Sequence, residues 1–264
     1  RTFIDMKDSE IVSQLAGEAG LSADVEDTKV KHRYVFQSSQ TNLSFIRERA
    51  MLLNFEVDVD QKNAKLAFKS AKKKPTDGGE LKWGLNLFRF DLRISAETQV
   101  SSVKVKGWDM HAKAGLTGSA AKTDIVYEMD SKIVSGSTVT EDHWGARSVL
   151  YTGKPIHVQG EADAMAVAYL NRLSMTYSEG EATCQGDPKL DAGVCITIDG
   201  VGIRAGGKFY VYKTLHHYEP GTGYTTQLSL LRSTERTGEA KSDPPPKKVS
   251  PRTDEPVETE DWVE

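Results

Sequence analysis

The sequence predicts an α+β protein, in which a small helix-plus-hairpin domain is followed by a mostly antiparallel β-barrel with one packed helix. Apolar residues recur at helical spacing in two short segments near the start of the chain and in one later segment. Between Gly186 and Leu231, segments rich in Val, Ile, Tyr and Thr alternate with Gly and Pro, which is typical of strands joined by turns. The 264 residues, 38% of them hydrophobic, suffice for one large or two modest cores.

Two short helices and an extended segment are predicted at the beginning of the chain. Asp8 or Ser9 can cap the first helix, and Gly20 suits the left-handed residue that often follows a helix. Asn42 is predicted to cap the second helix, which has one apolar and one charged face. Between the two helices, Tyr34–Gln37 is predicted to be extended.

A β-hairpin is predicted next, because apolar and polar residues alternate over Phe55–Val59 and again over residues 64–68, with turn residues between them. We assign residues 1–72 to this α+β shoulder domain. Lys72–Gly79 is predicted to be a loop, since its lysines, proline and glycines favour a solvated tip over a phosphate site.

The β-barrel domain is predicted over residues 81–232, where strand patterns begin at Leu81. Residues 112–153 are rich in Gly, Ser, Thr and Lys with weak periodicity, and we expect loops or an excursion there. An Ala-rich helix is predicted near residues 161–178, and its small side chains would allow close packing against a sheet.

The stretch from Gly186 to Leu231 holds the residues to which we assign structural roles in the barrel. Gly supplies positive φ and Pro presets φ, so these residues mark the turns between strands. The structural motif consists of the turn formers Asp187, Pro188, Gly193 and Gly207, the packing residues Tyr210, His217 and Tyr224, and Thr225.

The last segment, residues 236–264, combines prolines and many acidic residues with almost no apolar content. Such a composition cannot bury enough apolar surface to fold, so we expect a disordered or extended tail.

The overall composition excludes several functional classes. With 34 basic and 38 acidic residues, the net charge of −4 argues against nucleic-acid recognition and against an anionic membrane surface. No run of residues approaches the roughly 18 apolar residues of a membrane span, and the first eight lack a signal-peptide core. Because the chain starts on Arg1 rather than Met, we expect it to be a piece of a longer protein.

Neither a metal site nor a cofactor site is predicted. The six histidines form no HExxH pair, and the adjacent His216 and His217 would point to opposite faces of a strand. Residues 200–205 fit the loose GxGxxA form of a dinucleotide fingerprint, but a strand-like segment follows where that motif needs a helix. A turn between strands is the better interpretation.

No catalytic signature is found either. Two carboxylate pairs could be imagined in a glycoside hydrolase, but both lie in turn-rich sequence where acids are expected anyway. These pairs are Glu179 with Glu181 and Asp187 with Asp191. Cys184 and Cys195 are too few for a disulfide scaffold. We favour two reduced cysteines, and a contact between them across the intervening turn stays open.

Several segments, taken in their order, carry a family resemblance: Asp8–Leu21, Gln40–Ala50, Phe55–Val57, Val103–Asp109, Gly186–Gly193, Gly207–Val211 and Gly223–Thr226. Together they resemble the phage late control D family, the baseplate hub proteins of contractile tails, over about residues 1–232. The hub portion of the valine-glycine-repeat (VgrG) spike proteins of type VI secretion and of extracellular contractile injection systems is similar.

The resemblance implies a structural protein without enzymatic activity or cofactor. It implies a homotrimer at the end of a tail tube, with two tube-like barrels per subunit that form a pseudo-sixfold ring. The implied partners are other copies of the chain, the tail tube protein, the spike protein, and a tape measure protein or cargo in the lumen. Such a protein is made in the bacterial cytoplasm and assembled into a phage tail or an injection particle. The family's first barrel would precede Arg1, and no spike domain follows the barrel in these residues.

Two alternatives from other functional classes stay open. One is a tail-associated cell-wall glycan hydrolase, whose acids would be Glu179, Glu181 or Asp187. The other is a wall-binding module with an aromatic platform, for which the candidates are Trp83, Trp108 and Trp144.

Overall fold

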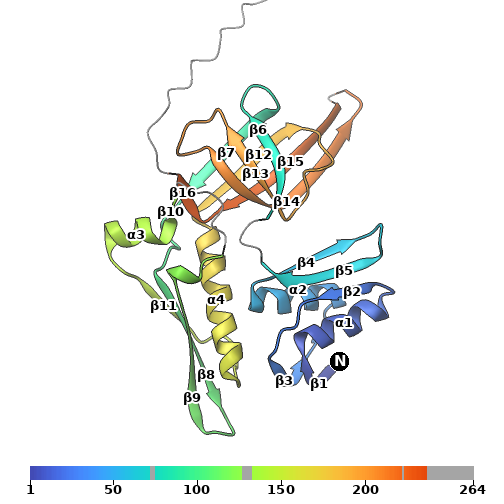
Figure 1. The fold of residues 1–264 in the computed structure, drawn as a ribbon, viewed down its shortest axis with the longest axis vertical. Coiled ribbons are helices and arrows are strands. Elements are labelled where there is room, and N and C mark those ends of the chain that lie inside the picture. Colours follow the sequence, from blue (N-terminus) through green and yellow to red (C-terminus); the bar gives the residue numbers. More distant parts are fainter. Residues whose placement is uncertain (72–74, 127–132, 222, 237–264) are drawn as a thin grey trace, which may run out of the picture.

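The computed structural model describes residues 1–71, 75–126, 133–221 and 223–236 (Figure 1). The predicted α+β fold class is confirmed, since the sheets are mostly antiparallel and helices pack beside them. The elements group into an N-terminal unit, a barrel and a sheet–helix unit, with the barrel at the top of Figure 1. The domain boundaries inferred from the sequence stay a prediction.

The N-terminal unit contains two small sheets and two helices. Its elements are β1 (Thr2–Lys7), α1 (Asp8–Glu18), β2 (Ser22–Val25), β3 (Lys31–Phe36), α2 (Asn42–Leu53), β4 (Phe55–Asp60) and β5 (Lys65–Ser70). Strand β1 pairs with β3, and β5 lies between β2 and β4. The predicted helices, the extended segment before α2 and the β4–β5 hairpin are confirmed. Their apolar faces meet in one core that includes Ile11, Phe45 and Phe68.

The helix caps differ from the predicted ones. The side chain of Thr41, rather than Asn42, accepts a hydrogen bond from the Ser44 amide at the start of α2. Helix α1 begins at Asp8, with Lys7 in the cap position, and the Asp8 side chain is completely buried instead of capping. The positive φ of Gly20 just beyond α1 agrees with the predicted helix end.

The barrel is one curled sheet of six strands. They are β6 (Thr76–Lys82), β7 (Leu87–Ile94), β12 (Ser178–Gln185), β13 (Val194–Asp199), β14 (Gly207–Glu219) and β15 (Gly223–Arg232), in the order β6-β13-β14-β15-β12-β7. Neighbouring strands are antiparallel except β13 and β6. The two edge strands, β6 and β7, follow each other in the chain, and Trp83 and Leu87 form a bridge in the turn that joins them. Phe209, Val211 and Leu228 belong to the apolar cluster inside.

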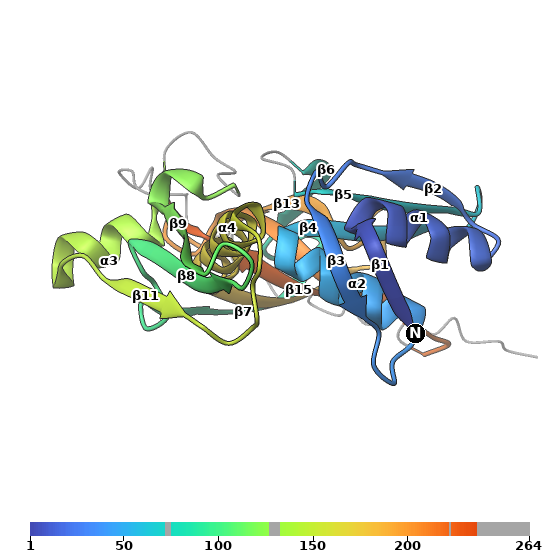
Figure 2. The ribbon, with the colours of Figure 1, turned by 90° about the horizontal axis from the view of Figure 1, so that it is seen from below.

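The sheet–helix unit lies beside the N-terminal unit. Its sheet has the order β11-β8-β9, formed by β8 (Ser102–Asp109), β9 (Ala114–Ala121) and β11 (Ser148–Tyr151). Helix α4 (Gln159–Met175) lies between this sheet and α2, and Figure 2 shows it end-on. The other elements are η1 (Lys122–Asp124), β10 (Ile133–Ser135), α3 (Gly136–Trp144) and β16 (Thr234–Arg236), of which β10 pairs with β16.

The Ala-rich helix predicted near residues 161–178 is α4, and its close packing against a sheet is confirmed at β9. A Cβ atom on Gly118 would lie 2.1 Å from the carbonyl oxygen of Ala162, so only glycine permits this approach. The partner sheet is the one formed by β8, β9 and β11, and the region 81–232 therefore divides between two sheets.

Two predicted loops are wrong. Residues 112–153 contain β9, α3 and β11. Strand β9 was missed because the buried positions on it are Gly118 and Ala120, which carry too little apolar bulk for an alternating pattern. In the predicted loop Lys72–Gly79, the residues from Thr76 onward belong to β6, while Lys72, Lys73 and Lys74 lie outside the described residues.

The two cysteines lie in different clusters. Cys184 packs inside the barrel, whereas Cys195 packs with Met175 in a separate cluster, and no disulfide joins the two. The contact between them that the sequence left open is therefore absent from this structure. Burial, helped by the charge of Asp187, raises the pKa of the Cys184 thiol to about 11.

The end of the chain is described only in part. Arg236 closes strand β16, and residues 237–264 of the predicted tail lie outside the described residues. Among the described helices, none has the length and apolar character needed to cross a membrane.

Candidate functional site on the outer face of the barrel

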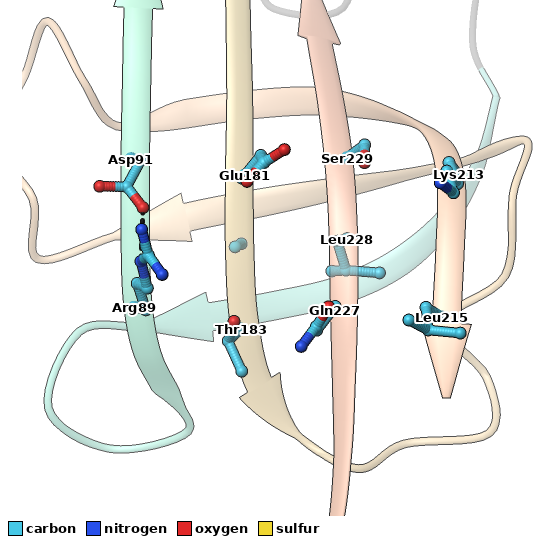
Figure 3. Close-up of a pocket in the computed structure, with 10 residues that line it drawn as sticks. Arg89, Asp91, Glu181, Thr183, Lys213, Leu215, Gln227, Leu228 and Ser229 are labelled. Atoms are coloured by element: carbon cyan, nitrogen blue, oxygen red, sulfur yellow. Dashed lines mark hydrogen bonds and ion pairs between the residues drawn. The ribbon is translucent and has the colours of Figure 1, made fainter. Parts of the chain in front are cut away.

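Four neighbouring strands of the barrel, β7, β12, β15 and β14, expose a polar outer face (Figure 3). Strand side chains alternate between the two faces of a sheet, so the neighbours of the buried Ala182 and Leu228 point outward. Register places Asp91, Glu181, Ser229 and Lys213 in one row across the four strands. The next row consists of Arg89, Thr183, Gln227 and Leu215. We call these two rows the outer barrel face.

The outer barrel face is hollowed slightly, with a cavity of about 190 Å³. Its net charge is zero, because it contains two basic residues, Arg89 and Lys213, and two acidic residues, Asp91 and Glu181. Arg89 Nε lies 2.6 Å from Asp91 Oδ2, but the two side chains are 72% and 58% exposed. Ion pairs this exposed contribute little to stability.

The chemistry available to the outer barrel face is that of a hydrated, charge-balanced surface. Carboxylates that act as paired acid and base are set apart by different degrees of burial. Here Asp91 and Glu181 are both exposed on neighbouring strands. Leu215 is the apolar side chain exposed among the two rows. The face is therefore a hydrated surface on which both charge signs are exposed.

The predicted turn formers Asp187, Pro188 and Gly193 lie between β12 and β13. The Asp187 amide donates to Thr226 Oγ1 at 3.2 Å, and Asp187 Oδ1 accepts a hydrogen bond from the Lys189 amide at 2.9 Å. Gly193 has a φ of +90°, which favours glycine. These residues connect the two strands at one end of the barrel.

Tyr224, Thr225 and His217 lie near the hairpin end of β14 and β15. The Tyr224 hydroxyl is 2.9 Å from Nδ1 of His216, and its ring lies so close to Gly186 that a Cβ there would be 2.2 Å away. His217 faces Thr225 in the register and is exposed. The histidine that contacts Tyr224 is thus His216.

Gly207 and Tyr210 lie at the opposite end of β14. Gly207 has a φ of +113°, and the Tyr210 hydroxyl donates to Glu56 Oε1 at 2.9 Å. Burial and the neighbouring Glu56 carboxylate raise the pKa of Tyr210 well above its ordinary value. Because Glu56 lies on β4, this hydrogen bond joins the barrel to the N-terminal unit.

Arg232 anchors the loop after β13, a role that the sequence does not predict. Its guanidinium donates to the carbonyl oxygens of Gly206 at 2.7 Å and Arg204 at 2.9 Å, and lies 4.3 Å from the ring centre of Phe209. The only signal for it was its position at the end of the apolar strand pattern of β15. The loop itself contains residues 200–205, so the interpretation of that segment as a turn between strands is confirmed.

A buried network of charges was also missed, where α1, α2, β3 and α4 meet. Asp8 accepts hydrogen bonds from Arg49, with Nε–Oδ1 and Nη2–Oδ2 distances of 2.5 and 3.0 Å. His32 Nε2 lies 2.8 Å from Asp8 Oδ2, and its Nδ1 lies 3.7 Å from Glu161 Oε1 on α4. Burial opposes the charge of Asp8, but the hydrogen bonds from His32 and Arg49 outweigh it and hold the pKa of Asp8 below its ordinary value.

The candidate acids of the first alternative lie on or just after one strand, whereas the tryptophans of the second are spread over the molecule. Glu179 and Glu181 alternate on β12 with buried residues, and Asp187 lies in the turn beyond. Trp83, Trp108 and Trp144 are at least half exposed but come from the β6–β7 connection, β8 and α3. Among the described residues, no group of three or more His, Cys, Asp or Glu is placed to hold a metal ion.

Comparison with solved structures shows that the fold is shared with prophage and phage-like tail proteins. The 43 kDa tail protein of prophage MuSo2 from Shewanella oneidensis matches with a TM-score of 0.60 and 13% identity over 88% of this chain and 66% of its own. A tail protein from Neisseria meningitidis MC58 matches with a TM-score of 0.56 and 12% identity, over 88% of this chain and 68% of its own. The chain thus spans about two thirds of these proteins.

A third solved structure and a family model extend the comparison. A prophage tail protein from Listeria monocytogenes EGD-e matches with a TM-score of 0.50 and 13% identity, over 86% of this chain and 65% of its own. No curated protein matches the chain. The family model of the Alg8 N-terminal domain matches residues 1–219.

Proposed function

The chain belongs to the Alg8 N-terminal domain family, and from this premise and the tail-protein fold we propose that it is a baseplate hub component of a contractile tail. In this proposal it joins the tail tube to the spike as part of a trimeric ring, in a phage tail or a contractile injection system. Its partners are two further copies of itself, the tail tube protein and the spike protein. The ring is made in the bacterial cytoplasm and assembled into the particle.

The outer barrel face is the observation on which the proposal depends. A tube that conducts a tape measure protein or cargo needs a hydrated lumen. The surface of that lumen must not bind positively charged, negatively charged or apolar segments tightly. Arg89, Asp91, Glu181 and Lys213 supply both signs at exposed positions, and polar neutral residues fill most of the remainder. We propose that this face lines the lumen of the ring.

The curled sheet supports the same assignment. A tube wall must not offer free strand edges to passing polypeptides, because such edges pair with other chains. In this barrel the edge strands β6 and β7 follow each other in the chain, and the short turn that joins them contains the Trp83–Leu87 bridge. Closed cyclic symmetry would then bring identical contacts around the ring.

Mass measurement in solution tests the assembly. We expect the full-length protein to form a trimer, alone or once its tube protein is added, in light scattering or native mass spectrometry. A full-length protein that stays monomeric and never joins the tube would contradict the proposal.

Cysteine accessibility tests the assignment of the lumen. The native Cys184 and Cys195 are buried, so a Gln227→Cys substitution on the outer barrel face gives a selective label. We expect a bulky polymer-maleimide to modify Gln227→Cys in the free chain but only slowly in the assembled ring, while a small maleimide still reacts. Asp58→Cys on the exposed part of β4 is the matched control. Equal protection from both reagents would instead place Gln227 in a subunit interface.

A further inference from the structure

The sheet of the sheet–helix unit has one open face opposite α4. Val103, Val105 and Ala120 are buried against the helix side. Strand alternation and register place the intervening residues on the other face, where Lys104 lies opposite Ser119 and Lys106 opposite Thr117. The full set is Ser102, Lys104, Lys106 and Trp108 on β8, Gly115, Thr117, Ser119 and Ala121 on β9, and Ser148 and Leu150 on β11. We call this set the basic sheet face.

Positive charge on the basic sheet face is not compensated locally. Lys104 and Lys106 are both exposed, and the set contains no acidic residue. Within the described part of the chain, the lysines found in ion pairs are Lys7, Lys65, Lys69, Lys82, Lys122 and Lys154. Lys104 and Lys106 therefore present two adjacent positive charges on the same strand.

An apolar element accompanies these charges. Trp108 is 55% exposed and Leu150 is 54% exposed. Opposite Trp108 stands Gly115, where an added Cβ would meet no atom within 4 Å, so the space beside the indole is open. Lysines beside an exposed indole suit an acidic peptide that carries an aromatic or aliphatic side chain.

The chain itself contains a segment with the complementary composition. Residues 253–264, outside the described part, include six acids and no base, together with apolar side chains. The acids are Asp254, Glu255, Glu258, Glu260, Asp261 and Glu264, and the apolar residues Val257, Trp262 and Val263 lie among them. We propose that this acidic segment docks on the basic sheet face through Lys104 and Lys106, with Trp262 beside Trp108.

The connection is long enough for this docking. Strand β16 ends at Arg236 beside β10, next to the sheet–helix unit (Figure 1). Residues 237–252 connect β16 to the acidic segment, and sixteen residues reach up to about 50 Å when extended. Tethering also raises the local concentration of the segment well above that of a free peptide. A nucleic acid is a poorer fit, since tight binding to phosphates draws on more positive charges than these two lysines.

Lysine acetylation footprinting on the full chain tests the proposal without disturbing the fold. The chain would be treated briefly with an acetylating reagent, and the rate at each lysine followed by mass spectrometry. The test variant replaces all six acids of the segment by their amides, from Asp254→Asn to Glu264→Gln. We expect Lys104 and Lys106 to react at least about threefold faster in this variant than in the native chain. The difference should shrink at high salt, where screening weakens the charge pairs.

Two controls make the result specific. Lys189 and Lys208 are exposed on the barrel side, and their rates should be the same in both proteins. A Lys247→Gln/Lys248→Gln variant changes the tail but leaves the acids in place, so it should retain protection of Lys104 and Lys106. Trp262→Ala should relieve part of the protection, because it removes the indole that is proposed to lie beside Trp108.

The outcomes that would overturn the proposal are distinct. Equal rates at Lys104 and Lys106 in the native chain and in the amide variant would show that the segment does not cover them. Protection that persists in the amide variant and grows with protein concentration would assign the basic sheet face to contact between copies. Neither result depends on whether the chain forms a baseplate hub.

Discussion

The barrel and the N-terminal unit are held in place by different forces. The barrel encloses an apolar cluster in which Phe209 and Leu228 are almost completely buried. Within the N-terminal unit, a buried ion pair joins Asp8 of α1 to Arg49 of α2, and His32 beside it lies 3.7 Å from Glu161 of α4. Apolar burial is nondirectional and indifferent to pH, whereas a buried ion pair depends on both partners and on their ionisation. The barrel should therefore survive acid conditions that weaken the N-terminal unit.

The largest effect is expected in the barrel core. Phe209→Ala removes a fully buried ring that packs edge-on against Phe90 and beneath the Arg232 guanidinium. We expect a loss of about 4 kcal/mol in the free energy of unfolding, measured by urea denaturation followed by circular dichroism. The matched control is Tyr212→Ala on the same strand, where the side chain is 51% exposed and the expected loss is much smaller. Similar losses for both variants would mean that the inside of the barrel is not the dominant core.

A smaller but still large effect is expected at the buried ion pair of the N-terminal unit. Asp8→Ala leaves the buried Arg49 without its carboxylate, and breaking a buried pair in this way costs about 3 kcal/mol. Replacing both members, as Asp8→Leu with Arg49→Met, should recover part of this loss because no charge remains unpaired. A double variant whose loss equals the sum of the two single losses would show that the pair is not coupled.

The pH dependence distinguishes the two regions directly. The pKa of Asp8 is held below its ordinary value, so its contribution to stability is complete above that value, near pH 3.8. The contribution is lost as the pH falls through the lowered pKa, because protonation removes the hydrogen-bonded carboxylate. We expect Asp8→Asn to flatten the acid branch of the stability curve, while Phe209→Ala shifts the whole curve without changing its slope. An unchanged acid branch in Asp8→Asn would exclude Asp8 as a source of acid sensitivity.

A smaller effect is expected at the hydrogen bond that links the barrel to the N-terminal unit. Tyr210→Phe removes the hydroxyl that donates to Glu56 and leaves the ring in place. We expect a loss of about 1 kcal/mol, the usual net value of one hydrogen bond. Tyr212→Phe, at an exposed position on the same strand, is the control with no expected change. Hydrogen exchange at β4 should rise in Tyr210→Phe if the contact holds the two parts together.

Helices and strands were predictable where the sequence pattern that defines them is contained in a short segment of the chain. The helical spacing of α1 and α2 and the alternation of β4 and β5 are of this kind, because each amphipathic face is visible in a short window. Strand β9 was not predictable in this way, since Gly118 is explained only by its contact with Ala162, far along the chain. Likewise, the burial of Asp8 depends on partners at His32 and Arg49, and their approach is set by tertiary packing.

The histidines of β14 show a second limit of local reasoning. Phe209 and Val211 point into the barrel, and simple alternation would continue that face through His217. The strand has a bulge between Val211 and Lys213, where the register shifts by one residue. Beyond the bulge, Thr214 and His216 lie on the face of the sheet that Phe209 and Val211 occupy before it. Both histidines are exposed, and the one that contacts Tyr224 is His216. Nothing in the residue types of this strand marks the position of the bulge.

The smallest effect on stability is expected at the outer barrel face, where Arg89 and Asp91 pair in solvent. Arg89→Ala should change the free energy of unfolding by no more than about 0.5 kcal/mol, because both side chains are mostly exposed. If the face lines a lumen, its function depends on the balance of positive and negative charges. Arg89→Glu should therefore leave the free energy of unfolding nearly unchanged and yet impair particle assembly or cargo passage. The control is Lys62→Glu, an equally large charge change at the exposed turn of the N-terminal unit. A strong loss of stability in Arg89→Ala would show instead that these charges stabilise the barrel. The outer barrel face would then contribute to stability as the buried core does.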